Sequence, residues 1–126
     1  VCSPLTRTLQ TATLCFAQQH ARGVPIVPLE SLRETVNYLC DARRNKAQLE
    51  SEFPTVSWAD GEVAEVDPLW EQYEKVYGSA VEYTEERECK HFPSLSARLA
   101  SAFAWILARP EREIALVSHM GFFFHS

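Results

Sequence analysis

The chain has 126 residues, of which 46% are hydrophobic and 23% charged, and its formal net charge is −5. This composition predicts one soluble globular domain over residues 1–126 with a single core, and the acidic balance argues against general nucleic-acid binding. No apolar run approaches the roughly 18 residues that a membrane span needs, and no signal peptide is recognisable. The cysteines form no CxxC pair, which favours reduced thiols in a cytoplasmic protein. These cysteines are Cys2, Cys15, Cys40 and Cys89.

The first expected element is a helix from residue 3 to about residue 20. Ser3 is a good N-cap, and Pro4 suits the first helical position because its missing N–H would have no partner there. Arg7 then falls near the positive end of the helix dipole, where a cation is unfavourable unless an anion binds beside it. Because a guanidinium presents a planar fork of donors to phosphoryl oxygens, this segment indicates a phosphate site.

Apolar spacing and turn residues predict the remaining elements in chain order. Gly23 is expected to stop the first helix. It is followed by a short strand over 26–29, by a mostly loop segment with short helical turns over 30–47, and by a helix from Asn45 to residue 53. A turn-rich stretch over 57–67 then leads to a helix over 68–77. The last two expected elements are a helix from residue 93 or 94 to just before Pro110 and a buried strand over 114–117.

This order of elements predicts an α/β fold with a mostly parallel central sheet flanked by helices. Both ends of the chain read as cuts through that single partial domain, because the first residues resemble a strand end and the last ones form an apolar run. Ligands of such sheets bind beyond the carboxyl ends of the strands. Residues 3–7 and 118–121 follow two of these ends, so we expect Arg7 and His119 to converge on one rim of the sheet.

Two segments resemble the histidine phosphatase superfamily, which is also called phosphoglycerate mutase-like. The segment SPLTRTLQTA, residues 3–12, is similar to the S-P-L-x-R-x-x-Q-T-A motif of that family, and residues 116–122 resemble its strand with the second core histidine. The resemblance implies an α/β fold and a phosphohistidine mechanism that needs no metal or other cofactor. It also implies a small phosphorylated substrate or phosphate as the partner.

The resemblance assigns roles residue by residue. Arg7 matches the second phosphate-binding arginine, and His119 matches the histidine that contacts the transferring phosphoryl group. Glu34 best matches the acid that protonates the leaving oxygen and later helps to activate water, with Glu30 as the competing candidate. Around these catalytic candidates, four residues are expected to bind the substrate: Ser3, Thr6, Met120 and Gly121.

The chain departs from the family pattern in two places. Met120 stands where the family usually has glycine, so Gly121 is expected to supply the backbone freedom of this loop. The family's nucleophilic histidine lies in an Arg-His-Gly sequence, and these 126 residues contain none. The sequence therefore predicts a phosphomonoester hydrolase whose nucleophile is missing from this chain, so that the chain alone is inactive.

Other functions compete with this hypothesis. A non-catalytic relative that binds a phosphate ligand or a partner would keep Arg7, and a mutase would transfer the phosphoryl group instead of hydrolysing it. A cysteine-phosphatase loop is disfavoured because Cys2 and Arg7 are one residue too close together. Cys89 and His91 lack a second ligand pair for a metal. The neighbouring Arg43 and Arg44 are expected to be a solvated charge cluster, with binding of a second substrate anion as the alternative.

Overall fold

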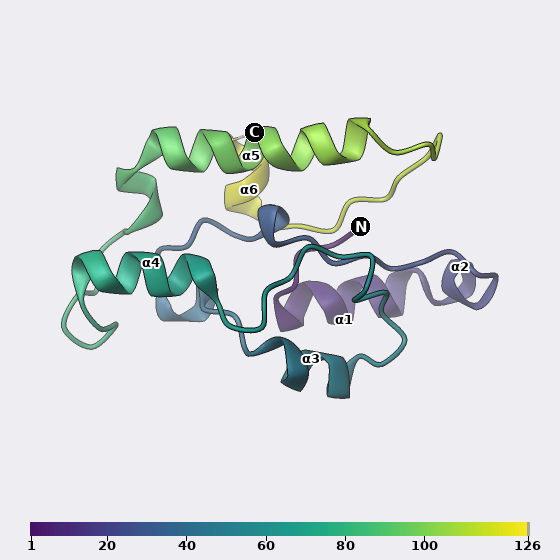
Figure 1. Cartoon of the computed structure of the whole chain (residues 1–126), viewed down its shortest axis with the longest axis horizontal. Coiled ribbons are helices and arrows are strands. Elements are labelled where there is room, and N and C mark those ends of the chain that lie inside the picture. The colour runs from purple at the N-terminus through teal and green to yellow at the C-terminus, as the bar shows by residue number, and fades with distance from the viewer. Residues whose placement is uncertain (126) are drawn as a thin grey trace.

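The computed structural model describes residues 1–125, and in that range it is built from helices and extended segments. Its α-helices are α1 (Thr6–Cys15), α2 (Ala17–Ala21), α3 (Lys46–Glu52), α4 (Pro68–Tyr77), α5 (Phe92–Leu107) and α6 (Met120–His125), and its 3-10 helices are η1 (Glu30–Leu32), η2 (Leu39–Asp41) and η3 (Glu88–Lys90). The longest helix, α5, lies on one side of the extended segments, and α1 and α3 lie on the other (Figure 1).

The predicted parallel sheet is wrong. Residues 1–125 contain no strand, and only isolated parallel bridges join Cys2 to Pro28, Cys2 to Val117, and Leu29 to Glu62. Segments 26–29 and 114–117 therefore run extended beside residues 1–3 without forming a ladder. Proline supplies part of the reason, because Pro28 has no N–H to donate and Pro4 directly follows the paired segment.

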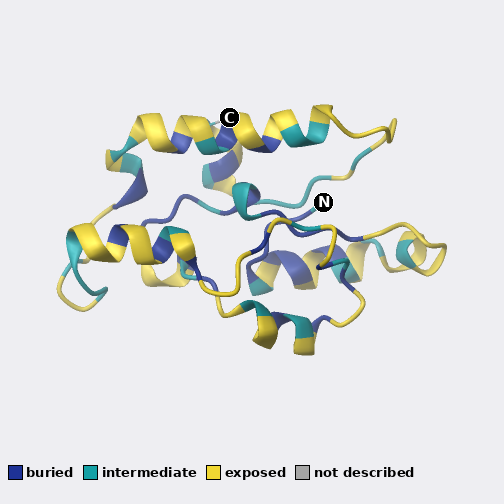
Figure 2. Cartoon of the chain, in the orientation of Figure 1, coloured by how far each residue is buried: buried dark blue, intermediate teal, exposed yellow. Residues whose placement is uncertain are grey.

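The extended segments nevertheless pack as a two-sided layer. Cys2, Ile26 and Val117 belong to the core shared with α1 and α3, whereas their neighbours Val27 and Leu116 belong to the core under α5 and α6. This alternation follows from the extended backbone, in which successive side chains point to opposite faces. In Figure 2, exposed residues cover the outer side of α5 and buried ones lie on the side that faces the extended segments. Residues 26–29 are buried. The expected burial of residues 114–117 on both faces is wrong, because Ala115 is exposed and the other three residues are only partly buried.

The first helix begins later than its cap signals predict. Leu5 occupies the N-cap position of α1, so Ser3 and Pro4 precede the helix. The Ser3 hydroxyl accepts a hydrogen bond from the Leu5 N–H at 3.4 Å, while the Thr8 hydroxyl donates to the carbonyl of Ser3 at 2.9 Å. The chain turns here before helical geometry starts, and Arg7 becomes the second residue of α1.

The middle helices agree well with the expected ones. α4 covers the predicted range 68–77, and the Asp67 carboxylate caps it by accepting from the Trp70 N–H at 2.9 Å. α3 and α5 begin within two residues of their expected starts. α6 was not predicted, because its run of phenylalanines carries no helix start signal. Within residues 1–125, no helix is long and apolar enough to cross a membrane.

Candidate functional site

Arg7 and His119 meet although 112 positions separate them. The Arg7 Nε–H lies 3.3 Å from His119 Nδ1. One parallel bridge between Cys2 and Val117 aligns residues 1–3 with residues 116–118, and the backbone N–H of Ser3 donates to the carbonyl of Val117 at 2.9 Å. The expected convergence therefore occurs through a single bridge instead of a sheet.

His119 is buried and neutral at physiological pH. It is 7% exposed, and its Nε2 lies 2.8 Å from the hydroxyl of the fully buried Ser3. Burial, followed by the charges of Arg7, Arg33 and Arg98, lowers the pKa of His119 from 6.5 to about 4. Both effects act in the same direction, because low dielectric surroundings and nearby cations disfavour the imidazolium. An anion placed against Arg7 would remove part of this penalty.

The other nitrogens of the Arg7 guanidinium contact acceptors in η2. Its Nη1 donates to the carbonyl of Cys40 at 2.8 Å, and its Nη2 lies 3.5 Å from the Asp41 carboxylate. The Arg7 side chain is 47% exposed, so an incoming anion can reach it from solvent. The 3.5 Å ion pair is long for an arginine–carboxylate contact, which leaves room for a phosphoryl oxygen to replace it.

Glu34 lies against the start of α6. A Cβ built on Gly121 would lie 2.2 Å from Glu34 Oε1, so only glycine lets this carboxylate approach the helix so closely. Glu34 Oε1 also accepts from the Thr35 N–H at 3.0 Å. Met120, by contrast, is 84% exposed at the first position of α6. Thr6 begins α1, and its hydroxyl accepts from Arg44 Nε at 3.2 Å.

The competing glutamate has a different environment. Glu30 accepts from Arg33 Nη1 at 2.8 Å, and Arg43 Nε lies 3.1 Å from its second oxygen. Two buried arginines thus pair with Glu30, which suits a structural carboxylate, although both of their hydrogen bonds go to Oε1 and the buried Oε2 has no hydrogen-bond partner. Glu34 has no ion pair within residues 1–125, and its carboxylate lies against Gly121, which follows His119 by two positions in the sequence. The geometry favours Glu34 as the acid, and the roles of all these residues stay predictions.

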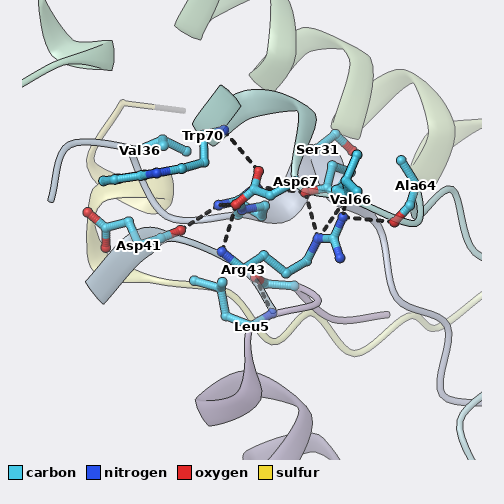
Figure 3. A network of polar contacts seen from close by, with 12 residues as sticks. Leu5, Ser31, Val36, Asp41, Arg43, Ala64, Val66, Asp67 and Trp70 are labelled. Atoms are coloured by element: carbon cyan, nitrogen blue, oxygen red, sulfur yellow. Dashed lines mark hydrogen bonds and ion pairs between the residues drawn. The ribbon is translucent and has the colours of Figure 1, made fainter. Parts of the chain in front are cut away.

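A buried ionic network holds the loop that carries Glu34, and Figure 3 shows its polar contacts. Arg33 is fully buried and forms a bidentate ion pair with Asp67, and its Nη2 also donates to the carbonyl of Asp41. Asp67 further accepts from the Arg43 N–H at 2.6 Å. Burial alone would raise the pKa of Asp67, but the hydrogen bonds and charge of Arg33 outweigh it and hold that pKa below its usual range.

A second buried pair fixes the same loop from the side of α5. Arg98 donates to both oxygens of Glu88, at 2.9 and 2.7 Å, and to the carbonyls of Ser31 and Arg33 at 3.0 and 2.9 Å. An arginine that bridges a carboxylate and two carbonyls satisfies acceptors that would otherwise be buried without partners. The backbone leading into Glu34 is thereby tied to both α4 and α5.

Sequence reasoning missed most of this support. Arg43 was expected to be solvated, yet it is 5% exposed and donates to the carbonyls of Arg44 and Ala64 at 2.7 and 2.8 Å. Arg44 is exposed, as expected, and pairs with Glu52 at 2.6 Å. Asp67 directly before Pro68 indicates a helix N-cap, but it gives no sign of the buried arginines that pair with it.

Other candidate chemistry receives no support from the geometry. Burial raises the pKa of the Cys2 thiol to about 12, which keeps it protonated and unsuited to nucleophilic attack. Within residues 1–125, no group of three or more histidine, cysteine or acidic side chains could hold a metal ion. An apolar hollow of about 450 Å³ lies between α1 and the segment 113–117, and Arg7, Glu34 and His119 do not line it.

Comparison with known proteins decides the family. The model of the histidine phosphatase superfamily (branch 1) matches residues 1–123. The chain belongs to this superfamily. Its sequence is 31% identical to phosphoglycerate mutase-like protein 1 of Arabidopsis thaliana, over the whole chain and 49% of that relative. It is 29% identical to another Arabidopsis phosphoglycerate mutase-like protein, over 97% of the chain and 49% of the relative.

Membership in the histidine phosphatase superfamily confirms the resemblance seen in the sequence. The chain spans about half the length of the curated relatives it matches. No solved structure matches it significantly. The matched residues 1–123 include Arg7, Glu34 and His119, so all three catalytic candidates lie inside the family region.

Proposed function

We propose that this histidine phosphatase-like chain provides the phosphate-binding part of a phosphomonoester hydrolase that acts on small phosphorylated substrates. The contact between Arg7 and His119 carries the proposal, because it joins a solvent-reachable guanidinium to a buried neutral imidazole at 3.3 Å. The Arg7 guanidinium would donate bidentate hydrogen bonds to two oxygens of a phosphoryl group. These bonds would stabilise the negative charge on the equatorial oxygens during phosphoryl transfer.

Each residue has a separate task in this proposal. Arg7 leaves the Cys40 carbonyl and Asp41 and binds two phosphoryl oxygens. His119 takes up a proton once the phosphate dianion offsets the charge of Arg7, and it then donates to a third oxygen. Glu34 transfers a proton to the leaving oxygen in the first step and accepts one from the attacking water in the second.

The covalent step needs a histidine from outside this chain. Its ring nitrogen would form a bond to phosphorus while the ester P–O bond breaks and the alcohol leaves with the proton from Glu34. Water then attacks the phosphohistidine, releasing phosphate and the free histidine. Since residues 1–126 contain no Arg-His-Gly sequence, we propose that the chain by itself binds phosphate but does not turn over.

Calorimetry with the 126-residue chain tests the binding step. Phosphate or vanadate should bind weakly to the unaltered chain, and Arg7→Ala should abolish the binding. Arg22→Ala is the matched control, because Arg22 is an exposed arginine at the end of α2. Unchanged phosphate affinity in Arg7→Ala, with thermal melting showing that the variant is folded, would overturn the proposal.

Phosphoryl transfer between two substrate positions is the second candidate, because both matched relatives are named phosphoglycerate mutase-like. A mutase must retain the phosphorylated intermediate and exclude water, whereas a hydrolase must admit water to Glu34. Incubation of the complete protein with a phosphomonoester in ¹⁸O-labelled water separates the two. Label in the released phosphate supports the hydrolase, and an isomerised phosphoester without label supports the mutase.

A further inference from the structure

Arg87 is a buried arginine without an anionic partner. It is 1% exposed, and it forms no ion pair with any other residue of the range 1–125. The other buried guanidiniums are all paired with carboxylates: Arg33 with Asp67 and Glu30, Arg43 with Glu30, and Arg98 with Glu88. Because burying an unpaired charge is costly, the exception at Arg87 requires an explanation.

The contacts of Arg87 satisfy only part of its guanidinium. Nη2 donates to the carbonyls of Gly78 and Tyr83 at 2.9 and 3.4 Å. The guanidinium carbon lies 4.8 Å from the centre of the Trp70 ring and 5.4 Å from that of Tyr83, which gives cation–π stabilisation. Nη1 is also buried, and it has no hydrogen-bond partner. A guanidinium held by rings and carbonyls therefore still has a donor free.

A small hollow adjoins this guanidinium. It has a volume of about 190 Å³ and is lined by Arg87 together with Asn37, Tyr38, Leu39, Trp70, Ala80, Tyr83 and Thr84. Tyr38 and Leu39 are exposed, so the hollow is reachable from solvent. Its volume is below the roughly 300–1,000 Å³ of sites for drug-sized ligands, which restricts it to a small molecule.

From this combination we propose that the hollow beside Arg87 binds a small organic monocarboxylate with a flat, apolar body. Binding would have to open the wall over the buried Nη1 of Arg87 so that the carboxylate accepts from it, and the body would lie against the rings of Trp70 and Tyr83. One free donor group and one cation suit a monoanion better than a phosphate dianion, which needs several donors. Thr84 also lines the hollow and is the only hydroxyl-bearing aliphatic residue among its lining residues.

This site is separate from the one proposed for phosphate. Arg7 and His119 do not line the hollow, and none of the hollow's residues is among the catalytic candidates. The two sites share only the turn 37–41, because Asp41 accepts from the N–H groups of Asn37 and Tyr38 at 3.2 and 2.9 Å and also faces Arg7. A result that contradicts the hydrolase proposal therefore leaves the proposed carboxylate site unaffected, and the reverse is also true.

Titration of the 126-residue chain with benzoate, followed by NMR of the Trp70 indole N–H, tests the proposal. We expect a saturable shift with benzoate, and at least tenfold weaker binding of benzamide, which has the same shape without the charge. A response to benzamide equal to that of benzoate, or no saturable response to benzoate, would overturn the site. So would equal binding of inorganic phosphate in competition.

Substitutions locate the binding. Arg87→Met removes the cation at similar size, and Ala80→Leu fills the hollow while leaving Arg87 in place; both should weaken benzoate binding at least tenfold. Arg109→Met is the control, since Arg109 also stacks on a ring, that of Trp105 at 5.0 Å, but lies exposed and pairs with Glu111. If circular dichroism shows Arg87→Met to be unfolded, Ala80→Leu decides, and unaltered binding in Ala80→Leu refutes the proposal.

Discussion

Arg7 donates its Nε–H to His119 Nδ1 over 3.3 Å, and this contact selects the tautomer of the imidazole. Arginine has no acceptor nitrogen, so Nδ1 must be unprotonated and the proton of the neutral ring must be on Nε2. Nε2 lies 2.8 Å from the Ser3 hydroxyl, which can accept from it. His119 is therefore a neutral Nε2–H imidazole whose protonation depends on the charge at Arg7.

Arg7→Met should raise the pKa of His119. Burial is the larger cause of the lowered pKa, and the charge of Arg7 is the next, so the pKa should move from about 4 part of the way toward 6.5. NMR titration of the His119 ring nitrogens measures it, and Arg22→Met, which alters an exposed arginine on α2, is the control. A pKa of His119 that is the same in both variants would contradict the coupling.

Binding of sulfate, a tetrahedral dianion that carries no proton of its own, should be accompanied by proton uptake at about pH 6. The free site keeps His119 neutral at that pH, and a bound dianion on Arg7 offsets the charge that opposes protonation. Calorimetric titrations in two buffers with different ionisation enthalpies should therefore give different apparent binding enthalpies. His119→Gln should remove that difference. Identical enthalpies in both buffers for the unaltered chain would show that His119 does not charge on binding.

The chain should lose stability as the pH falls from about 6.5 to about 4. The pKa of His119 is lower in the folded state than in the unfolded one, so the unfolded state binds the proton more readily over this range. The contribution is fully present above pH 6.5 and is lost as the pH falls to about 4, with a size on the order of 3 kcal/mol. Urea unfolding at several pH values in this range measures the free energy of unfolding. In His119→Gln, that free energy should fall less with decreasing pH, and the difference from the unaltered chain should equal the contribution of His119.

Asp67→Asn should destabilise the fold strongly. It leaves Arg33 buried with a weakened partner and removes the charged acceptor of the Arg43 and Trp70 N–H groups. Breaking a buried pair from one side costs about 3–5 kcal/mol. Glu52→Gln breaks the half-exposed pair with Arg44 and should cost less than about 1 kcal/mol. Urea denaturation measures the free energy of unfolding of both variants. Similar losses of this free energy in Asp67→Asn and Glu52→Gln would contradict a structural role for the buried network.

Local chemistry made part of the fold predictable. Pro68 and the apolar spacing after it predicted α4 with its correct bounds, because an N1 proline and a helical stripe need no distant partner. The same holds for the approach of Arg7 to His119, which followed from two short segments that end extended stretches. Burial of residues 26–29 was also evident from their apolar run, whereas the apolar run 114–117 is only partly covered and Ala115 is exposed.

The sheet and the ionic network were not predictable in this way. An apolar run indicates a buried extended segment, but whether neighbouring segments form a ladder depends on register and on donors such as the one that Pro28 lacks. Arg33 gives no local sign of burial, because its partner Asp67 lies 34 positions away. Pairing across such distances is a property of the folded chain and not of any sequence window.

Glu34→Gln should reduce hydrolysis by the complete protein much more than Glu30→Gln does, once folding is accounted for. Glu34 is near the His119 segment and free of ion pairs within residues 1–125, whereas Arg33 and Arg43 hold Glu30 in place. Loss of a general acid costs about 10²–10⁴-fold in rate. Rates with a phenyl phosphate substrate measure kcat, and urea unfolding checks that Glu34→Gln is as stable as the unaltered protein.

The choice of leaving group sharpens this last test. Protonation matters less for a leaving group that is already a weak base, so Glu34→Gln should slow an alkyl phosphate more than a nitrophenyl phosphate. Gly121→Ala provides an independent variant, because its Cβ would meet Glu34 Oε1 at 2.2 Å and displace the carboxylate without removing it. Gly121→Ala should also slow the alkyl phosphate more than the nitrophenyl phosphate, but by a smaller factor than Glu34→Gln. Equal slowing of both substrates by Glu34→Gln would mean that Glu34 is not the acid, and the assignment would then pass to Glu30.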